Sequence, residues 1–232
     1  MKIDRHGQAK ILTPEEIKAL FSPEYSNARD RALYAVMLYT ACRVREAVTL
    51  RKRDVYDLKG NVRPEILFRK GNTKGKLATR SVPVIEDLRR KLEEYQPRKS
   101  NSFLFPGHQY SPRKKSYLHQ DSAMLILRKA CKRIGIEGVS SHSFRRTALT
   151  EMSNAGVPLR IIQEISGHRT LDELYKYLEV REDQVRGAVS YLTMLTPAND
   201  DDWEDNGNTE IGKSTFPDPQ SNPHQSEISP LQ

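Results

Sequence analysis

Apolar residues recur at helical spacing through most of the first 195 residues. Leu33, Val36 and Leu38 follow this spacing within residues 28–40, which predicts a mostly buried helix there. Upstream, Thr13-Pro14-Glu15-Glu16 is a capping box with proline at the first helical position, so a helix should cover about 14–21. Further helices are predicted over about 43–50, 86–96, 119–134, 142–155 and 158–166, with shorter ones to about 195.

Two short segments depart from the helical pattern. Residues 65–69 (EILFR) and 79–84 (TRSVPV) are rich in β-forming residues, and Gly71, Asn72 and Gly75 lie between them. This arrangement predicts a β-hairpin with a mobile turn. The expected fold class is therefore mainly α with a small antiparallel β-sheet, that is, α+β.

The composition changes near Pro197. Beyond it Asp, Asn, Pro, Ser and Gln dominate, and apolar residues are scarce. Such a segment cannot bury enough apolar surface to offset its conformational entropy, so we expect it to be disordered. The predicted organisation is a lead-in over 1–12, one domain over 13–196 and an acidic tail over 197–232.

Charge is distributed unevenly between these parts. The chain carries a net charge of +8, and the tail, with eight acidic residues against a single lysine, carries −7. Residues 1–196 therefore carry +15. A body this basic favours a polyanionic partner, most often nucleic acid. The alternative is a solvated basic surface with no specific partner.

The sequence gives no sign of a membrane or secretory segment. No apolar run approaches the roughly 18 residues that span a bilayer, and the charged start MKIDRHGQAK lacks the apolar core of a signal peptide. Cys42 and Cys131 lie in apolar-patterned stretches. We expect them to be buried free thiols of a cytoplasmic protein with no membrane partner.

Several residues are suited to phosphate chemistry. His142 and Arg145 are three apart on a predicted helix and so share a face, as do Arg43 and Glu46. Arg146 points about 100° away from Arg145, which predicts a DNA backbone contact or a surface charge. A guanidinium fork matches two phosphate oxygens, so two forks from different helices suit one phosphate.

Taken singly, each candidate has an ordinary explanation. A histidine beside a glycine, like His168, is usually a helix cap or a satisfied core group. Tyr175 and Tyr177 are of a kind that usually packs half-buried, and Lys74 in a glycine-rich turn is by default solvated. The order and spacing of the whole set carry the argument.

That order resembles the tyrosine recombinase family, the site-specific recombinases related to phage integrases. TACRVRE (40–46) resembles the family's first-arginine segment, with Arg43 as the arginine and Glu46 as the supporting acid. HSFR fits the family's His-x-x-Arg motif and gives His142 and Arg145. The match covers about residues 11–195.

The third matching segment contains the nucleophile of the family. SGHRTLDELYKYLEV (166–180) resembles the Gly-His segment that is followed, nine residues after the histidine, by the nucleophilic tyrosine. Counting from His168 gives Tyr177, not Tyr175. Three motifs in the right order make the resemblance specific.

A lysine is expected in the hairpin turn. The family places it some five residues before a basic residue and a Val-Pro pair, which correspond here to Arg80 and Val82-Pro83. Lys74 lies six residues before Arg80 and is the candidate. Lys70 and Lys76 are its competitors.

The resemblance implies a catalytic domain over 13–196 that cuts and rejoins double-stranded DNA through a covalent 3′-phosphotyrosine. It implies no metal or other cofactor, a homo-oligomer on DNA that is a tetramer in the family, and a mobile genetic element as the source. The implied roles are nucleophile for Tyr177, base or proton relay for His142, phosphate ligands for Arg43, Arg145 and His168, and general acid for Lys74.

The chain also departs from the family pattern. Members of the family carry a helical core-binding domain before the catalytic domain. The first helix here begins near residue 14, so we expect no core-binding domain. An accessory protein that completes the clamp on DNA is therefore a possible partner. The tail over 197–232 has two expected roles: it folds back on the basic face, or it only aids solubility. Residues 182–195 are expected to dock either on a neighbouring copy or on their own domain.

Two other functions remain open. The first is strand relaxation of the type IB topoisomerase kind, which uses the same chemistry. The second is a DNA-binding regulator on a recombinase scaffold, because residues 142–166 form a helix, a glycine-containing turn and a helix.

Overall fold

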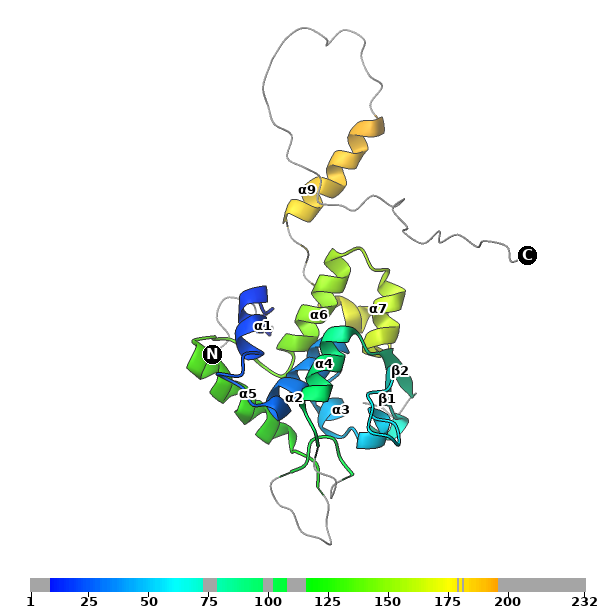
Figure 1. Ribbon diagram of the computed structural model, residues 1–232. Helices are drawn as coiled ribbons and strands as arrows, with labels where there is room; N and C mark the ends of the chain where they lie inside the picture. The colour runs from blue at the N-terminus through cyan, green and yellow to red at the C-terminus, as the bar shows by residue number, and fades with distance from the viewer. Residues whose placement is uncertain are drawn as a thin grey trace, which may run out of the picture. The chain divides into compact units, whose positions relative to one another are not determined.

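The computed structural model describes residues 9–72, 79–97, 102–107, 116–178, 180 and 182–195. The chain divides into two units, Met1–Val180 and Arg181–Gln232. The described part of the first unit is mainly helical with one two-stranded antiparallel sheet (Figure 1). The predicted α+β fold class is confirmed.

The helices of the first unit agree with the predicted ranges to within two residues at each end. They are α1 (Pro14–Leu20), α2 (Ala28–Tyr39), α3 (Val44–Val48), α4 (Glu86–Glu94), α5 (Gln120–Ile134), α6 (Ser143–Asn154), α7 (Leu159–Ser166) and the short α8 (Leu171–Tyr175). Two 3-10 turns, η1 (Lys52–Asp54) and η2 (Lys70–Asn72), flank the strand β1 (Glu65–Phe68), and β2 (Arg80–Pro83) follows.

The predicted capping box starts α1. The Thr13 hydroxyl accepts a hydrogen bond from the Glu16 backbone N–H at 3.3 Å, and the Glu16 carboxylate accepts one from the Thr13 N–H at 3.0 Å. Pro14 occupies the first turn, where its missing N–H costs nothing. Local sequence alone therefore fixes where this helix begins.

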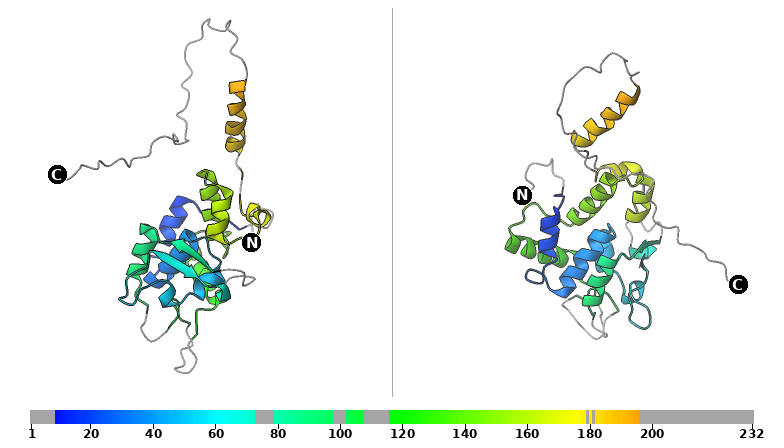
Figure 2. Two further views of the ribbon diagram at one scale, coloured as in Figure 1. Left: turned by 90° about the vertical axis from the view of Figure 1, so that its right-hand side faces the viewer. Right: turned by 45° about the horizontal axis from the view of Figure 1, so that its top comes forward.

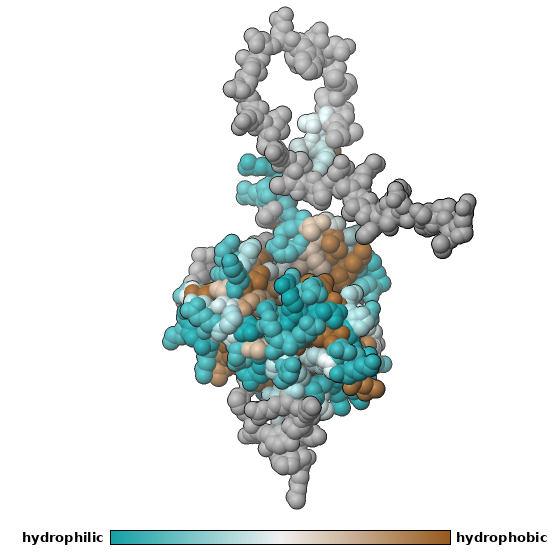
Figure 3. Space-filling model, viewed as in Figure 1, coloured by the Kyte–Doolittle hydropathy of each residue, from teal (hydrophilic) through white to brown (hydrophobic). Residues whose placement is uncertain are grey.

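Helix α2 lies at the centre of the core. Every residue from Ala32 to Leu38 is buried, and α2 contacts α3, α4 and α6 (Figure 1). Helix α4 buries Leu88 and Leu92, one turn apart, and hydrophilic residues cover the face of the molecule over α4 in Figure 3. Tyr34 stacks on Phe144 of α6 with 5.4 Å between ring centroids. This packing fixes α6, which carries two candidate site residues.

The predicted hairpin is present as β1 and β2 (Figure 2). Ile66 pairs with Val82 in antiparallel register, and both side chains are buried. Phe68 pairs with Arg80 at the end nearest the turn. Strand β2 also contacts α7, so the hairpin is attached to the helical body near that helix.

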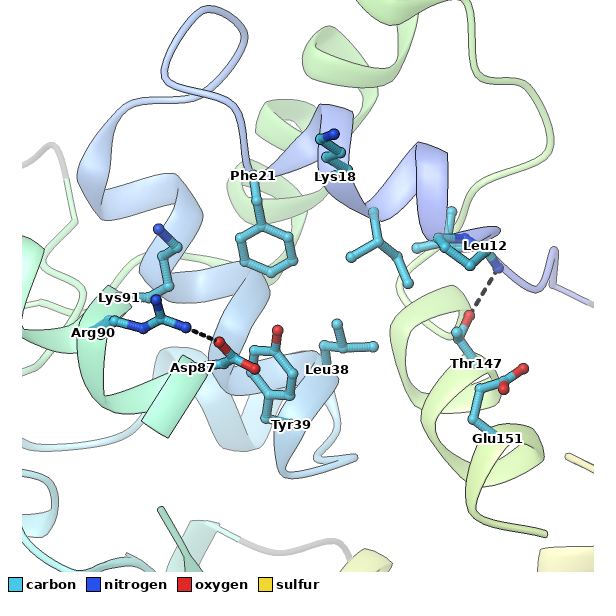
Figure 4. Close-up of a pocket in the computed structure, with 12 residues that line it drawn as sticks. Leu12, Lys18, Phe21, Leu38, Tyr39, Asp87, Arg90, Lys91, Thr147 and Glu151 are labelled. Carbon is cyan, nitrogen blue, oxygen red and sulfur yellow. Dashed lines mark hydrogen bonds and ion pairs between the residues drawn. The ribbon is translucent and has the colours of Figure 1, made fainter. Parts of the chain in front are cut away.

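Arg146 corrects one prediction. Its side chain is 4% exposed, so it is neither a surface charge nor positioned to contact DNA. Its Nη1 donates to the Ala9 carbonyl at 2.7 Å, and the hydroxyl of Thr147 accepts from the Leu12 N–H at 2.8 Å (Figure 4). The side of α6 facing away from Arg145 is covered by the lead-in over 9–12, whose irregular backbone has no periodic signal in the sequence.

Replacing Arg146 with methionine should therefore destabilise the fold. The Ala9 carbonyl loses a charged donor, which should lower the free energy of unfolding by about 1–3 kcal/mol. Urea unfolding measures this as a lower midpoint with an unchanged slope. Arg45→Met on the exposed side of α3 is the control and should stay within about 0.5 kcal/mol. Equal losses in both variants would contradict the buried anchor.

The two cysteines are buried free thiols, as predicted. Burial raises the pKa of Cys42 to about 12 and that of Cys131 to about 11. Neither thiol is a nucleophile at neutral pH.

The described part of the second unit consists of α9 (Glu182–Ser190) and the 3-10 turn η3 (Tyr191–Leu195). No residue of α9 is buried, and Val185, Val189 and Leu192 are each more than half exposed. The predicted tail over 197–232 lies outside the described residues. In the described part of the chain, no helix has the length and apolar character needed to cross a membrane.

Candidate active site

Arg43 is the N-cap residue of α3, and Glu46 lies one turn later. The Glu46 carboxylate accepts the backbone N–H of Arg43 at 2.8 Å, and its Oε1 lies 3.9 Å from Nη1 of the same arginine. The two share a face, as the spacing predicts. Within the described ranges this long ion pair is the only contact of the Arg43 guanidinium, so its donors remain available to a ligand.

Arg145 is 1% exposed, and its guanidinium is held on three sides. Nη1 donates to the carbonyls of Ala41 and Ser166, the latter at 2.9 Å, and Nη2 donates to Nε2 of His168 at 2.8 Å. The Nε–H has no partner among the described residues. Two donors of Arg145 therefore lack a partner among the described residues, the buried Nε–H and the second Nη2–H.

The charge of Arg145 persists despite its burial. Desolvation, followed by repulsion from Arg43, lowers the pKa of Arg145 to about 10. The side chain is thus a cation at neutral pH. The cluster brings two guanidinium charges together in a partly dehydrated place, where they act strongly on an anion.

Ala41 presents its carbonyl to Arg145 from an unusual backbone conformation. Its φ of +48° lies in the left-handed region, which residues with a Cβ rarely adopt. The side chain is buried with Leu149, Ile162 and Leu174, which hold the backbone in place. The geometry around Arg145 is therefore imposed by the surrounding packing.

His168 is neutral, and its proton can be located from its partners. An arginine only donates, so Nε2 of His168 must accept from Arg145, and Nδ1 carries the proton toward the Ser166 hydroxyl at 2.8 Å. The Ser166 hydroxyl in turn donates to the Gln163 carbonyl at 3.3 Å. Burial, then the nearby cations Arg145 and Arg43, lower the pKa of His168 to about 3.

This lowered pKa predicts a loss of stability in mild acid. The unfolded state takes up a proton on His168 near pH 6.5 and the folded state only near pH 3, so stability is full above about pH 6.5 and falls below it. Between pH 7.5 and pH 5.0 the wild type should lose about 2 kcal/mol more than His168→Asn. Urea unfolding at both pH values tests this, and an equal loss in both proteins would contradict the buried neutral ring.

Tyr177 follows α8 and lies against the cluster. The buried Leu174 anchors α8, and the backbone N–H of Tyr177 donates to the Leu174 carbonyl at 2.9 Å. The Tyr177 hydroxyl lies 3.3 Å from Nδ1 of His142. Its ring centroid lies 5.5 Å from the Arg145 guanidinium and 5.0 Å from the His168 ring. Four of the predicted residues therefore meet in one place.

The neighbouring tyrosine is positioned differently. Tyr175 ends α8 with its side chain 54% exposed, whereas Tyr177 is half-buried beside His142. His142 itself is the exposed N-cap residue of α6. Counting nine residues from His168 thus selects the tyrosine that lies in the cluster.

Two residues that sequence reasoning did not single out complete the cluster. Arg80 served only as a marker for the lysine, yet both its Nη atoms donate to Glu46, at 2.9 and 3.2 Å. Ser166 supplies both a carbonyl to Arg145 and a hydroxyl to His168. The available signals were the fixed position of Arg80 before Val82-Pro83 and of the serine before Gly-His.

The lysine stays a prediction. Lys74 and Lys76 lie outside the described residues. Lys70 begins η2, and its backbone N–H donates to the Thr79 hydroxyl at 3.1 Å. All three belong to the connection between β1 and β2.

A cavity elsewhere in the described part of the first unit is separate from the cluster. In the described ranges, no three His, Cys, Asp or Glu side chains come together as metal ligands would. A cavity of about 500 Å³ opens between α1, α2, α4 and α6 (Figure 4), lined by residues such as Phe21, Leu38 and Tyr39. It contains no residue of the cluster.

Known proteins share the sequence pattern. The model of the phage integrase family matches residues 10–184. Tyrosine recombinase XerA of Pyrococcus horikoshii is 30% identical over 188 residues, which cover 80% of this chain and 62% of that protein. Tyrosine recombinase XerC of Staphylococcus epidermidis is 27% identical over 183 residues, which cover 74% and 57%. The chain thus spans about three fifths of the length of these relatives.

Solved structures share the fold. The crystal structure of XerA recombinase has a TM-score of 0.62 and 24% identity, covering 86% of this chain and 68% of that one. XerH recombinase bound to palindromic difH substrate in a post-cleavage complex gives 0.62 and 21%, covering 82% and 55%. The catalytic domain of bacteriophage HP1 integrase gives 0.51 and 22%, covering 83% and 100%. The family model spans well over half of the chain, and with the geometry above this shows that the chain belongs to the phage integrase family.

Proposed function

We propose that the protein is a site-specific recombinase that cuts and rejoins double-stranded DNA through a covalent 3′-phosphotyrosine. The observation that carries this proposal is the position of Tyr177, whose hydroxyl lies 3.3 Å from an imidazole nitrogen of His142 and whose ring centroid lies 5.5 Å from the buried guanidinium of Arg145. A nucleophile, a base and a cation in contact are what an attack on a phosphodiester needs.

In the proposed step, the Tyr177 oxygen attacks the scissile phosphorus. A bond forms between phosphorus and the phenolic oxygen, and the bond from phosphorus to the 5′-oxygen breaks. The phenolic proton passes to Nδ1 of His142, and Lys74 supplies the proton that the leaving 5′-oxygen takes up. Attack by a 5′-hydroxyl reverses the step, so the phosphodiester is restored without an external energy source.

The arginines would carry the electrostatic part of the reaction. The guanidiniums of Arg145 and Arg43 would hold the non-bridging oxygens, on which charge accumulates in the transition state. These fixed cations take the place that a divalent metal occupies in other phosphoryl-transfer sites. The reaction is therefore proposed to proceed in EDTA.

His168 has a more specific role than a direct phosphate ligand. In the structure its Nε2 accepts from Arg145, so it orients that guanidinium in the protein without DNA. Donation from Nε2 to a phosphate oxygen requires a proton on that nitrogen. We propose that His168 first positions Arg145 and contacts phosphate only after the negative charge of DNA has raised its basicity.

Charge supports DNA as the partner. The +15 carried by residues 1–196 favours a polyanion, and solved relatives such as XerH are bound to their DNA substrates. Binding through many phosphate contacts falls steeply with salt. The proposed domains are a lead-in over 1–12, the catalytic domain over 13–196 and an acidic tail over 197–232.

The proposed assembly is a homo-oligomer on DNA, a tetramer during strand exchange. The exposed apolar side chains of α9, Val185 and Val189, are one turn apart and suit contact with a second copy. An accessory protein that completes the clamp on DNA is a further expected partner. Integration or excision of a mobile element is the proposed biological setting.

A suicide-substrate assay tests the proposed function. The full chain is incubated in EDTA with nicked duplexes tiled across the DNA that flanks its gene, and covalent complexes are separated on a denaturing gel. The expected result is an adduct whose peptide maps to Tyr177. Tight, salt-sensitive binding without an adduct would instead favour a DNA-binding regulator.

A further inference from the structure

Glu46 poses an electrostatic problem for a phosphate site. Its side chain is 1% exposed, lies 3.9 Å from the guanidinium of Arg43 and interacts electrostatically with Arg145, and both arginines are phosphate-binding candidates. Burial by itself raises the pKa of Glu46, but hydrogen bonds from Arg80 and the N–H of Arg43 outweigh it, and the pKa is lowered overall. The side chain is thus an anion beside the place where a second anion must bind.

Arg80 forms the close ion pair that neutralises the Glu46 carboxylate. Its Nη1 and Nη2 donate to the two carboxylate oxygens of Glu46 at 2.9 and 3.2 Å, a paired fork-to-fork contact. Arg43 reaches the same carboxylate with its guanidinium only at 3.9 Å. Among the two guanidiniums, Arg80 therefore holds the Glu46 carboxylate closely, and Arg43 makes only a long ion pair with it.

Three further contacts hold Arg80 in this orientation. Its Nε donates to the Ile165 carbonyl at 3.1 Å, and its guanidinium lies 4.4 Å from the centroid of the Phe68 ring. The backbone of Gly167 presses against it, since a Cβ there would lie 3.0 Å from Nη1 of Arg80. Gly167 also has a φ of +66°, so a side chain there would strain the backbone and crowd Arg80.

We propose that Arg80 is a positioning residue that neutralises Glu46 and thereby keeps the guanidinium of Arg43 free for the scissile phosphate. The inference rests on the proposed function, because it concerns the arginine that would hold that phosphate. Without Arg80, the Glu46 carboxylate would draw Arg43 into its own ion pair and repel the phosphate. Arg80 need not touch DNA to act in this way.

The same side chain joins three parts of the site. Arg80 belongs to β2, Glu46 to α3, and Ile165 and Gly167 to the end of α7, directly before His168. The Arg80 guanidinium therefore fixes the hairpin relative to both α3 and the end of α7. The connection between β1 and β2, which contains Lys74, starts from this fixed base.

The test is a two-residue cycle measured on the full chain with a nicked duplex that wild type cleaves. Arg80→Met should lower the first-order rate of adduct formation by about 10²-fold, as the loss of one oriented donor does. Duplex affinity should change less than about fivefold, because one contact among many is affected. Glu46→Gln/Arg80→Met should recover to within about tenfold of Glu46→Gln alone, since no buried anion is left to capture Arg43.

Recovery in the double variant distinguishes neutralisation from a purely structural role. A structural role predicts that the double variant cleaves as slowly as Arg80→Met. If Arg80→Met fails to fold, Glu46→Gln/Arg80→Met can still be compared with Glu46→Gln. In that case an adduct rate more than about 10²-fold below that of Glu46→Gln would overturn the proposal.

A second ion pair with a buried carboxylate provides the control; its arginine is 41% exposed, against 11% for Arg80. Arg69, next to β1, donates from Nε to the fully buried carboxylate of Asp54 at 2.6 Å, and neither belongs to the cluster. Arg69→Met should lower stability but leave the adduct rate within about threefold of wild type. A rate loss equal to that of Arg80→Met would overturn the proposal, as would wild-type cleavage by Arg80→Met. An absent adduct with wild type itself would instead overturn the proposed function.

Discussion

Tyr177→Phe should form no covalent adduct with DNA while binding it as wild type does. The variant loses only the phenolic oxygen, which is the proposed attacking atom 3.3 Å from His142. The ring that packs against His168 and Arg145 remains, so the fold and the phosphate ligands should be preserved. Removal of a nucleophile lowers catalysis by about 10⁴-fold or more. Gel separation of covalent complexes measures the loss, and a mobility shift measures binding.

Tyr175→Phe is the matched control for this experiment. Both tyrosines lose the same atom, but Tyr175 is largely exposed and lies outside the cluster. The control should form the adduct at the wild-type rate. Persistent adduct with Tyr177→Phe, or its loss with Tyr175→Phe, would show that the nine-residue spacing selects the wrong tyrosine.

Arg145→Lys should slow adduct formation by about 10²–10³-fold although the positive charge is kept. A lysine has a single ammonium group, whereas the planar guanidinium of Arg145 donates to Ala41, Ser166 and His168 and still has two further N–H groups. The ammonium must leave either these acceptors or the phosphate without a partner. Single-turnover cleavage of a nicked duplex measures the rate, and urea unfolding measures the accompanying loss of stability.

Arg146→Lys provides the comparison for Arg145→Lys. The two arginines are adjacent on α6, and both are buried, but Arg146 faces the lead-in instead of the cluster. Arg146→Lys should lower stability and leave the cleavage rate within about threefold of wild type. Equal slowing by both substitutions would mean that any change in α6 slows cleavage and that the guanidinium of Arg145 has no specific role.

Local patterns account for most of the fold that the sequence predicted. The capping box at Thr13 and the glycine that ends α7 each depend on a few neighbouring residues, so they could be predicted without knowledge of tertiary contacts. The hairpin register is similarly local, since Ile66 and Val82 must face the core together. The site could be located because its residues recur in motifs at fixed spacing.

Contacts between distant segments could not be predicted from the sequence. Arg80 reaches Glu46 across 34 residues and Ile165 across 85, and nothing near Arg80 in the chain indicates either partner. The contact from Arg146 to Ala9 spans 137 residues and reverses the expected exposure. Helical periodicity gave the right direction for that side chain but could not show what covers it.

The backbone of Ala41 indicates how this protein balances stability against arrangement of charge. A residue with a Cβ at φ +48° costs roughly 1–2 kcal/mol relative to ordinary conformations, and the core around Leu149 and Ile162 sustains that cost. Most proteins have only a few kcal/mol to spare before they unfold. The strained backbone at residue 41 lowers stability, but it presents the carbonyl that holds the Arg145 guanidinium in place before DNA binds. Less reorganisation of that guanidinium is then needed during the reaction.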